Sequence, residues 1–147
     1  MRTAFISGHI DVDILFFNKY YKEKIDEAIK NNDKFIIGDA RGIDKLAFEY
    51  ILSKYSKDNI TVYVYFPTNI EKYKKIGVNI IFNKYKNITE RDNLMTRNSD
   101  YDIAYTRTPE EQKLLYKEKY NASRISGTEK NILRRKHNLI LSQKRQK

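Results

Sequence analysis

Apolar side chains in this chain follow two different spacings, which alternate along most of its length. Five short segments are rich in apolar, β-branched or aromatic residues, as are strands that are buried on both faces of a sheet. Residues that favour turns, such as Gly, Pro, Asn and Asp, lie close to their ends. These segments predict β-strands at 2–7, 34–37, 59–66, 78–82 and 101–106.

Between these segments, apolar residues recur three or four positions apart, which is the period of one face of an α-helix. Asn31 to Asp33 end the first of these stretches, and Thr89 opens the fourth in a pattern typical of a helix cap. The spacing predicts helices at 13–31, 43–51, 70–76, 89–95, 109–119 and 132–141.

Strands that alternate with helices predict an α/β fold. We expect a Rossmann-like, doubly wound and mostly parallel sheet of about five strands, with helices on both faces and right-handed crossovers. In such folds the ligand crevice lies at the carboxyl ends of the strands.

The length of 147 residues, with 40% hydrophobic and 33% charged residues, is typical of one globular domain. We expect this domain to span 1–142. Residues 107–122 separate the last predicted strand from the last turn and form a probable insertion, which could act as a lid or an oligomer contact. Residues 143–147 form a basic tail.

The net charge of +10 is concentrated near the C-terminus. No acidic residue follows Glu129, whereas seven basic ones do: Lys130, Arg134, Arg135, Lys136, Lys144, Arg145 and Lys147. A basic segment of this kind suits either contact with a polyanion such as nucleic acid or a solvated helix end.

The chain contains no cysteine, which excludes disulfides, thiolate metal sites and cysteine nucleophiles. Its N-terminus lacks the pattern of a signal peptide, and no apolar run is long enough to cross a bilayer. We therefore expect a soluble cytoplasmic protein without a membrane partner, and we predict neither a metal site nor a cofactor.

The segment at 35–48 shows the arrangement most suggestive of a ligand site. An apolar strand stops at Gly38, and a helical pattern starts again after Gly42. A glycine-bounded turn between a strand and a helix presents backbone N–H groups to an anion. Asp39 and Arg41 place one charge of each sign at its mouth.

Three further segments would lie at the same edge of the predicted sheet, at 7–9, 90–93 and 126–128. Helix N-termini and small residues suit phosphate, and arginine offers paired hydrogen bonds to it. The predicted ligand-binding residues are Ser7, Gly8, His9, Gly38, Asp39, Arg41, Gly42, Asp44, Arg91, Asn93, Ser126, Gly127 and Thr128.

Each charged residue in these segments also has a purely structural interpretation. Arg41 could close a turn on Asp39 or Asp44, and Arg91 could cap its own helix together with Glu90. If the protein is an enzyme, Glu90 and Glu129 are the acid/base candidates, because cleavage of an N-glycosidic bond needs a carboxylate near the anomeric carbon.

Five motifs occur in an order that resembles the SLOG superfamily, a Rossmann-like group that includes YspA-type proteins, the lonely-guy (LOG) cytokinin-activating phosphoribohydrolases and the DNA-processing protein DprA. The motifs are Ser7-Gly8, the run from Gly38 to Asp44 with Ala47, Arg91 to Met95, Ser99-Asp100, and Ser126 to Thr128.

The resemblance implies a nucleotide-derived ligand and, as in many members, a homodimer. The LOG enzymes carry Pro-Gly-Gly-x-Gly-Thr before the last helix and a glutamate further along it. This chain has Arg-Ile-Ser-Gly-Thr there, and Glu129 follows Thr128 directly. The departure argues against phosphoribohydrolase activity by the LOG mechanism.

Three functions therefore stay open. The first is a sensor or binding protein for a nucleotide or nucleotide-derived phosphorylated ligand. The second is a LOG-like hydrolase or transferase acting on a nucleotide N-glycosidic bond, such as a nucleoside-monophosphate N-glycosidase. The third is DprA-like binding of single-stranded nucleic acid, aided by the basic tail.

Overall fold

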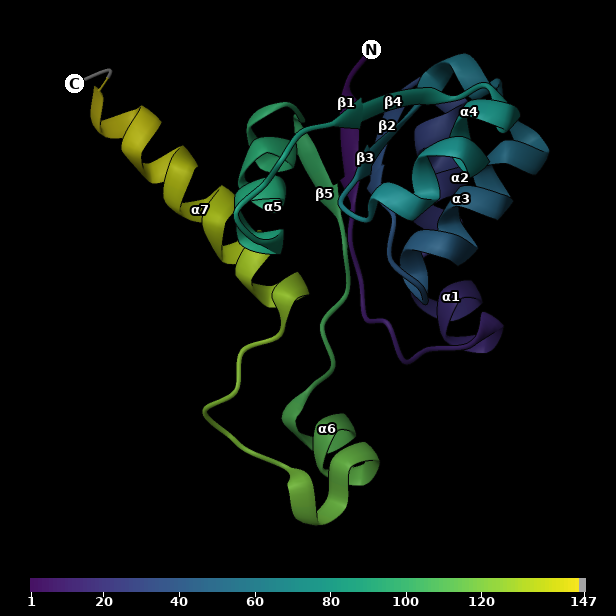
Figure 1. Cartoon of the computed structure of the whole chain (residues 1–147). Helices are drawn as coiled ribbons and strands as arrows, with labels where there is room; N and C mark the ends of the chain where they lie inside the picture. The colour runs from purple at the N-terminus through teal and green to yellow at the C-terminus, as the bar shows by residue number, and fades with distance from the viewer. Residues whose placement is uncertain (146–147) are drawn as a thin grey trace.

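The computed structural model describes the backbone of residues 1–145 and the side chains of residues 1–140. Five strands form one sheet in the order β4-β3-β2-β1-β5, and every neighbouring pair is parallel. The predicted α/β fold with a doubly wound, Rossmann-like sheet is confirmed (Figure 1). The strands are β1 (Thr3–Ile6), β2 (Lys34–Gly38), β3 (Ile60–Val64), β4 (Asn79–Phe82) and β5 (Tyr101–Ile103).

Helices connect the strands and cover both faces of the sheet. They are α1 (Ile14–Tyr20), α2 (Lys22–Lys30), α3 (Ile43–Lys54), α4 (Ile70–Ile76), α5 (Ile88–Arg97), α6 (Pro109–Tyr116) and α7 (Gly127–Arg145). Short 3₁₀ turns occur at Lys57–Asn59, Pro67–Asn69 and Lys117–Lys119. No helix within residues 1–145 combines the length and the apolar character needed to cross a membrane.

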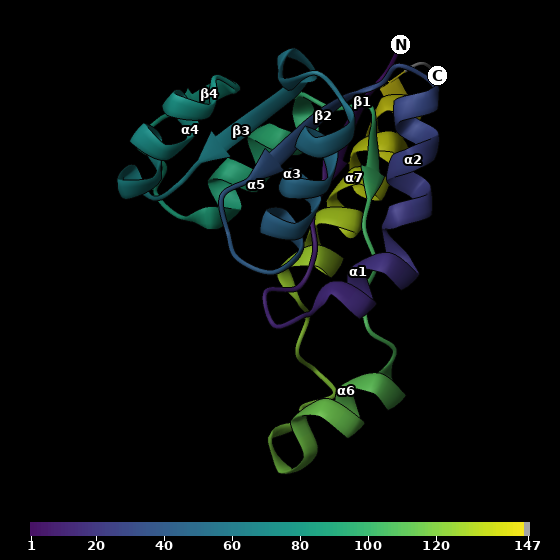
Figure 2. The same cartoon turned by 90° about the vertical axis from the view of Figure 1, so that its right-hand side faces the viewer.

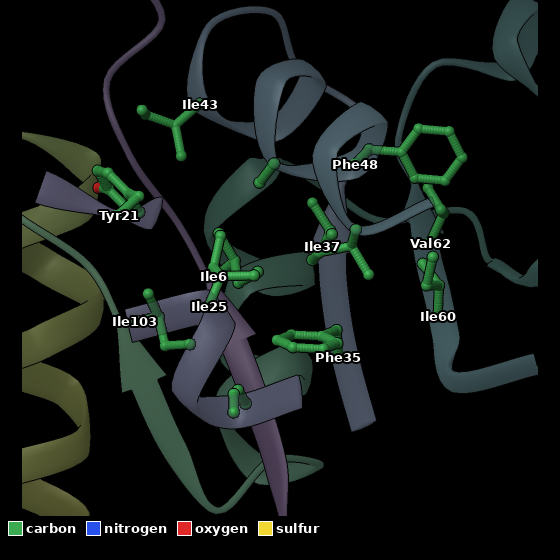
Figure 3. Close-up of a cluster of buried hydrophobic side chains, with 14 of the residues drawn as sticks. Ile6, Tyr21, Ile25, Phe35, Ile37, Ile43, Phe48, Ile60, Val62 and Ile103 are labelled. Atoms are coloured by element: carbon green, nitrogen blue, oxygen red, sulfur yellow. The ribbon is translucent and has the colours of Figure 1, made fainter. Parts of the chain in front are cut away.

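Successive side chains of the central strands enter hydrophobic clusters on opposite faces. Ile6 and Ile37 belong to the larger cluster, which β1, β2 and β3 form with α1 to α4 (Figure 3). Phe5 and Ile36 belong to the smaller one, which includes Met95 of α5. Because both faces of these strands are buried, the strands have the nearly continuous apolar sequences that predicted them.

The chain changes direction across the sheet between β1 and β5. It moves from β1 through β2 and β3 to the β4 edge and then returns to place β5 on the other side of β1. Helices α5 and α7 pack against each other, and Arg135 of α7 donates a 3.0 Å hydrogen bond to Asp102 of β5. Open α/β sheets bind ligands at such a switch point.

The single helix predicted at 13–31 is wrong, because the structure has two helices, α1 and α2, that meet at Tyr21. The backbone there departs from helical geometry, with φ −123° and ψ −40°. Tyr21 is fully buried, and its hydroxyl donates to the Ser7 carbonyl and accepts from the Tyr105 N–H. These long-range contacts fix the junction, and helical periodicity does not reveal them.

Several predicted boundaries also differ from the structure. Helix α5 begins at Ile88 with Asn87 as its cap, not with Thr89, because the Asn87 side chain accepts from the Glu90 N–H. Helix α7 is longer than predicted at both ends, so residues 143–145 of the expected tail continue it, and residues 146 and 147 lie outside the described residues.

The predicted strand at 101–106 is also too long, since β5 ends at Ile103. The chain then leaves the sheet, and residues 107–122 contain α6 and a 3₁₀ turn. They lie beyond the carboxyl ends of the strands in both views (Figure 1 and Figure 2).

Candidate functional site

A cavity of about 400 Å³ lies at the carboxyl ends of β1 and β2. The start of α5, the start of α7 and the insertion complete its walls. Its volume falls within the range of small-molecule sites, and its position is the one expected for a ligand crevice in this fold.

The cavity brings together most of the predicted ligand-binding residues from all four segments. Those that line it are Ser7, Gly8, His9, Gly38, Arg41, Asp44, Arg91, Ser126, Gly127 and Thr128. The remaining three, Asp39, Gly42 and Asn93, lie outside the lining.

Glu90 and Glu129 also lie outside the lining. The Glu90 carboxylate accepts a 2.7 Å hydrogen bond from the backbone N–H of Lys86, at an exposed position. The Glu129 N–H is bound by the Ser126 hydroxyl within the first turn of α7. The carboxyl groups that do face the cavity come from Asp11, Asp44 and Asp92.

Arg91 is buried and forms hydrogen bonds with two carboxylates. Its Nη1 lies 3.0 Å from Asp39 Oδ1, and its Nε and Nη2 lie 3.1 and 3.0 Å from Asp92 Oδ1. Asp39 is held in turn by the Phe66 N–H and the Asn69 amide. Arg91 therefore joins β2 to α5, and the strongly hydrogen-bonded Asp39 is part of this structural connection.

Asp44, in the first turn of α3, is the buried acid of the site. Its Oδ2 accepts a 3.2 Å hydrogen bond from the Ala40 N–H, and burial raises its pKa to about 7. The charge of Arg91 and the Ala40 hydrogen bond oppose this rise, whereas Asp92 and Asp39 add to it. Close to neutral pH, Asp44 can therefore hold or release a proton beside the cavity.

Glycines allow the turns around this acid to pack closely. A Cβ on Gly38 would lie 2.7 Å from Asp44 Oδ2 and 2.9 Å from Arg91 Nη1. Gly42 has φ +75°, and a Cβ there would lie 2.4 Å from the carbonyl oxygen of His9. Gly42, predicted as a ligand-binding residue, therefore packs against the backbone of the first turn of the site and lies outside the lining.

The first turn, after β1, contributes a hydroxyl and an imidazole. The Ser7 hydroxyl is buried and has no hydrogen-bond partner among the described residues. His9 Nε2 accepts from the Arg107 N–H at 3.3 Å. Burial and the positive charge of Arg107 lower the pKa of His9, so its imidazole is neutral at neutral pH.

The N-terminus of α7 supplies backbone donors to the same cavity. Ser126 caps the helix, since its side chain accepts from Glu129 N–H and its carbonyl accepts from Lys130 N–H. The N–H groups of Gly127 and Thr128 have no hydrogen bond within the part of the chain that the structure describes. A helix N-terminus of this kind favours an anion.

Several lining residues were not predicted to bind the ligand. They are Ile10, Asp11, Ile88, Asp92, Arg107, Gln112, Tyr116, Arg124 and Asn131, together with Phe5, Ile6 and Ala40. Asp92 adjoins the predicted Arg91, so its place on the α5 N-terminus could have been found. A lid is one interpretation of the insertion, but no local pattern shows which of its side chains reach the crevice.

The basic residues of α7 whose side chains are described are partly engaged within the fold. Arg134 donates to Asn131, and Arg135 donates to Asp102 and to the Ser99 carbonyl. Lys144, Arg145 and Lys147 lie outside the described side chains. Within residues 1–140, no group of three or more His, Asp or Glu residues could hold a metal ion.

Comparison of the chain with protein-family models, with curated proteins and with solved structures finds no match.

Proposed function

We propose that the protein binds a nucleotide or a nucleotide-derived phosphorylated ligand in this cavity, as a sensor or binding protein. The observation that carries the proposal is the buried Ser7 hydroxyl, which lacks a partner and lines the same cavity as the free N–H groups at the start of α7. A buried hydroxyl without a hydrogen bond is costly, and a phosphate oxygen would satisfy it.

The rest of the cavity suits the remainder of such a ligand. About 400 Å³ accommodates a mononucleotide-sized molecule. Asp44 and Asp92 offer acceptors to the hydroxyl groups of a sugar. The resemblance of the sequence motifs to the SLOG superfamily supports the same ligand class.

The test is binding of nucleoside 5′-monophosphates to the ligand-free protein, measured by thermal shift and by calorimetry. We expect stabilisation at millimolar ligand, because a ligand that binds only the folded state raises the free energy of unfolding. Ser7→Ala should weaken the affinity about five- to tenfold, which corresponds to one hydrogen bond of about 1 kcal/mol.

Thr96→Val is the matched control for Ser7→Ala. Thr96 also carries a buried hydroxyl without a partner among the described residues, but it lies outside the cavity lining. Its replacement should leave the affinity unchanged. Equal losses in both variants, or no stabilisation by any nucleoside monophosphate, would contradict the proposal.

Hydrolysis of a nucleotide N-glycosidic bond is the second candidate, and the position of Asp44 favours it. A buried carboxyl with a pKa of about 7 beside the cavity can protonate a departing base. Release of free base from a nucleoside monophosphate should then be abolished by Asp44→Asn and kept by Glu90→Gln and Glu129→Gln. The absence of free base from the wild-type protein excludes this activity on the substrates used.

A further inference from the structure

The insertion at 107–122 is fastened to the first turn of the site through the buried Arg107. Arg107 Nη1 lies 2.9 Å from Asp11 Oδ1, and Nη2 lies 3.1 Å from the Asp11 carbonyl oxygen. The Tyr116 hydroxyl, at the end of α6, donates to the other carboxylate oxygen of Asp11 at 3.2 Å. Asp11, which follows β1, thus binds Arg107 just before α6 and Tyr116 at its end.

A second set of contacts holds α6 from the side of α1. The Glu111 carboxylate accepts hydrogen bonds from the hydroxyl groups of Tyr20 and Tyr105 and from the Thr108 N–H. The rings of Tyr20 and Tyr105 stack with 3.7 Å between their centroids. The insertion is therefore docked at two places, and the side chains that it brings to the cavity have defined positions.

Arg124 lies two residues beyond the insertion, in the segment that leads to α7. Its guanidinium lies 5.6 Å above the Tyr116 ring and lines the cavity. Arg124 is exposed and forms no ion pair with the carboxylates of the described part of the chain. Stacking on an aromatic ring orients a guanidinium and leaves its N–H groups available.

Arg41, in the turn between β2 and α3, provides a second guanidinium to the same cavity. It also lines the cavity, is exposed and has no ion-pair partner among residues 1–140. The adjoining Gly42 packs against the backbone of His9 and Ile10, next to the residue that binds Tyr116. The first turn therefore contacts the turn that carries Arg41. It also binds Tyr116, the residue over whose ring Arg124 lies.

The charges in the cavity are therefore divided between its interior and its rim. Arg91 and Arg107 are buried, and carboxylates neutralise both of them. The unneutralised guanidinium groups belong to Arg41 and Arg124. The Ser7 hydroxyl and the first N–H groups of α7 can bind one phosphoryl group. The guanidinium groups of Arg41 and Arg124 are not needed for that group and stay available.

We propose that the ligand carries two phosphoryl groups and that Arg124, together with Arg41, binds the outer one. The inference rests on the proposed function and adds a ligand class to it, a nucleoside diphosphate or a molecule with an equivalent pyrophosphate. The segment that links the insertion to α7 then determines ligand selectivity, because it carries Arg124, one of the two outer cations. Guanidinium groups suit this role since they form paired hydrogen bonds with phosphate oxygens.

The experiment compares the affinities of AMP with ADP and of GMP with GDP by calorimetry on the whole chain at low ionic strength. The wild-type protein should bind the diphosphate of the preferred base at least about tenfold more tightly than the monophosphate. Arg124→Gln should reduce this ratio to about threefold or less and leave the monophosphate affinity unchanged, because it removes only a contact with the outer group.

Arg97→Gln is the matched control, since Arg97 is an exposed arginine at the end of α5 and lies outside the cavity lining. It should keep the wild-type ratio. Arg124 is exposed, so its replacement does not disturb the core, and an unchanged melting temperature without ligand verifies this. Arg41→Gln should reduce the ratio in the same way.

The outcomes separate this inference from the proposed function. Equal affinities for the mono- and diphosphates, or a wild-type ratio that persists in Arg124→Gln, would overturn the inference and leave nucleotide binding intact. A failure of all four nucleotides to bind would overturn both.

Discussion

At the scale of single residues, the site depends on how closely Gly38, Asp44 and Arg91 pack. Arg91 is held in place by hydrogen bonds to Asp39 and Asp92, and its charge offsets only part of the effect of burial on Asp44. Asp44 is left buried with only the Ala40 N–H as a hydrogen-bond donor to its Oδ2. The raised pKa of Asp44 is a direct consequence of this packing.

Replacement of Gly38 by alanine should lower the free energy of unfolding by about 1–3 kcal/mol, as overpacking of a buried site does. The added Cβ would lie within 3 Å of Asp44 and Arg91, which are held by their own hydrogen bonds. Chemical denaturation of the ligand-free protein measures the change. Gly127→Ala is the control, because a Cβ there has no heavy atom within 4 Å. Equal stability of the two variants would contradict this account.

The pKa of Asp44 predicts how stability depends on pH. Between about pH 4, where an unfolded aspartate titrates, and pH 7, the folded state binds more protons at Asp44, so stability falls as the pH rises. Asp44→Asn removes this contribution. The variant should gain about 2–3 kcal/mol relative to the wild type between pH 5 and pH 8, from about 1.4 kcal/mol per pKa unit.

Denaturation of both proteins across this pH range, without ligand, provides the measurement. The difference in the free energy of unfolding between the two proteins should increase from pH 5 to about pH 7, where folded Asp44 loses its proton, and then stay constant. A difference that does not vary with pH would show that Asp44 titrates at its ordinary pKa in the folded protein.

At the scale of elements, the insertion becomes part of the site through polar contacts and not through a hydrophobic core. Helix α6 has no buried residue, and its Leu114 is 79% exposed. Its position depends on Glu111, whose pKa the Tyr105 hydrogen bond lowers, and on the pair of Arg107 and Asp11. The contribution of Glu111 to docking is therefore fully present above its unfolded-state pKa and is lost as the pH falls through its lowered folded-state pKa.

Glu111→Ala should release α6 without unfolding the sheet. The change removes the acceptor for Tyr20 and Tyr105 and half of the capping box with Thr108, a motif whose loss costs about 0.5–2 kcal/mol. Hydrogen exchange should become faster in α6 and stay slow in β1 to β3.

The exposed neighbour Glu110 is the control for this variant, because none of the hydrogen bonds of the described residues uses its carboxylate. Glu110→Ala should leave the exchange of α6 close to that of the wild type. Unchanged exchange in Glu111→Ala would contradict docking through this carboxylate.

At the scale of the whole molecule, the same strands carry the site and both hydrophobic clusters. Neighbouring residues such as Phe5 and Ile6 enter opposite clusters, so neither cluster can be lost without the other. The turns that follow β1 and β2 form the interior of the cavity. Unfolding of β1 and β2 would therefore also disrupt the cavity.

Thermal unfolding should consequently show one cooperative transition of the sheet and its covering helices. Circular dichroism in the near and far ultraviolet should give the same melting temperature, and the calorimetric enthalpy should equal the van't Hoff enthalpy. Two resolved transitions within the sheet would contradict a single cooperative domain.

The sequence by itself determined the elements and the residues at the turns. Strands buried on both faces need continuous apolar runs, and helices need a three- and four-residue spacing, so both are visible locally. Glycines at 38 and 42 marked a tight turn for the same reason, since only glycine avoids the clash that a Cβ would cause there. These local requirements predicted the α/β fold and ten of the residues that line the cavity.

The tertiary structure alone decided which charges are free. Asp39 and Asp44 are indistinguishable in the sequence, yet one is bound by Arg91 and the other is left as a buried acid with a raised pKa. Likewise, Arg91 is neutralised, whereas Arg124 lies on the cavity without an ion pair among the described side chains. Such differences arise from contacts between segments far apart in the chain, which periodicity and composition do not encode.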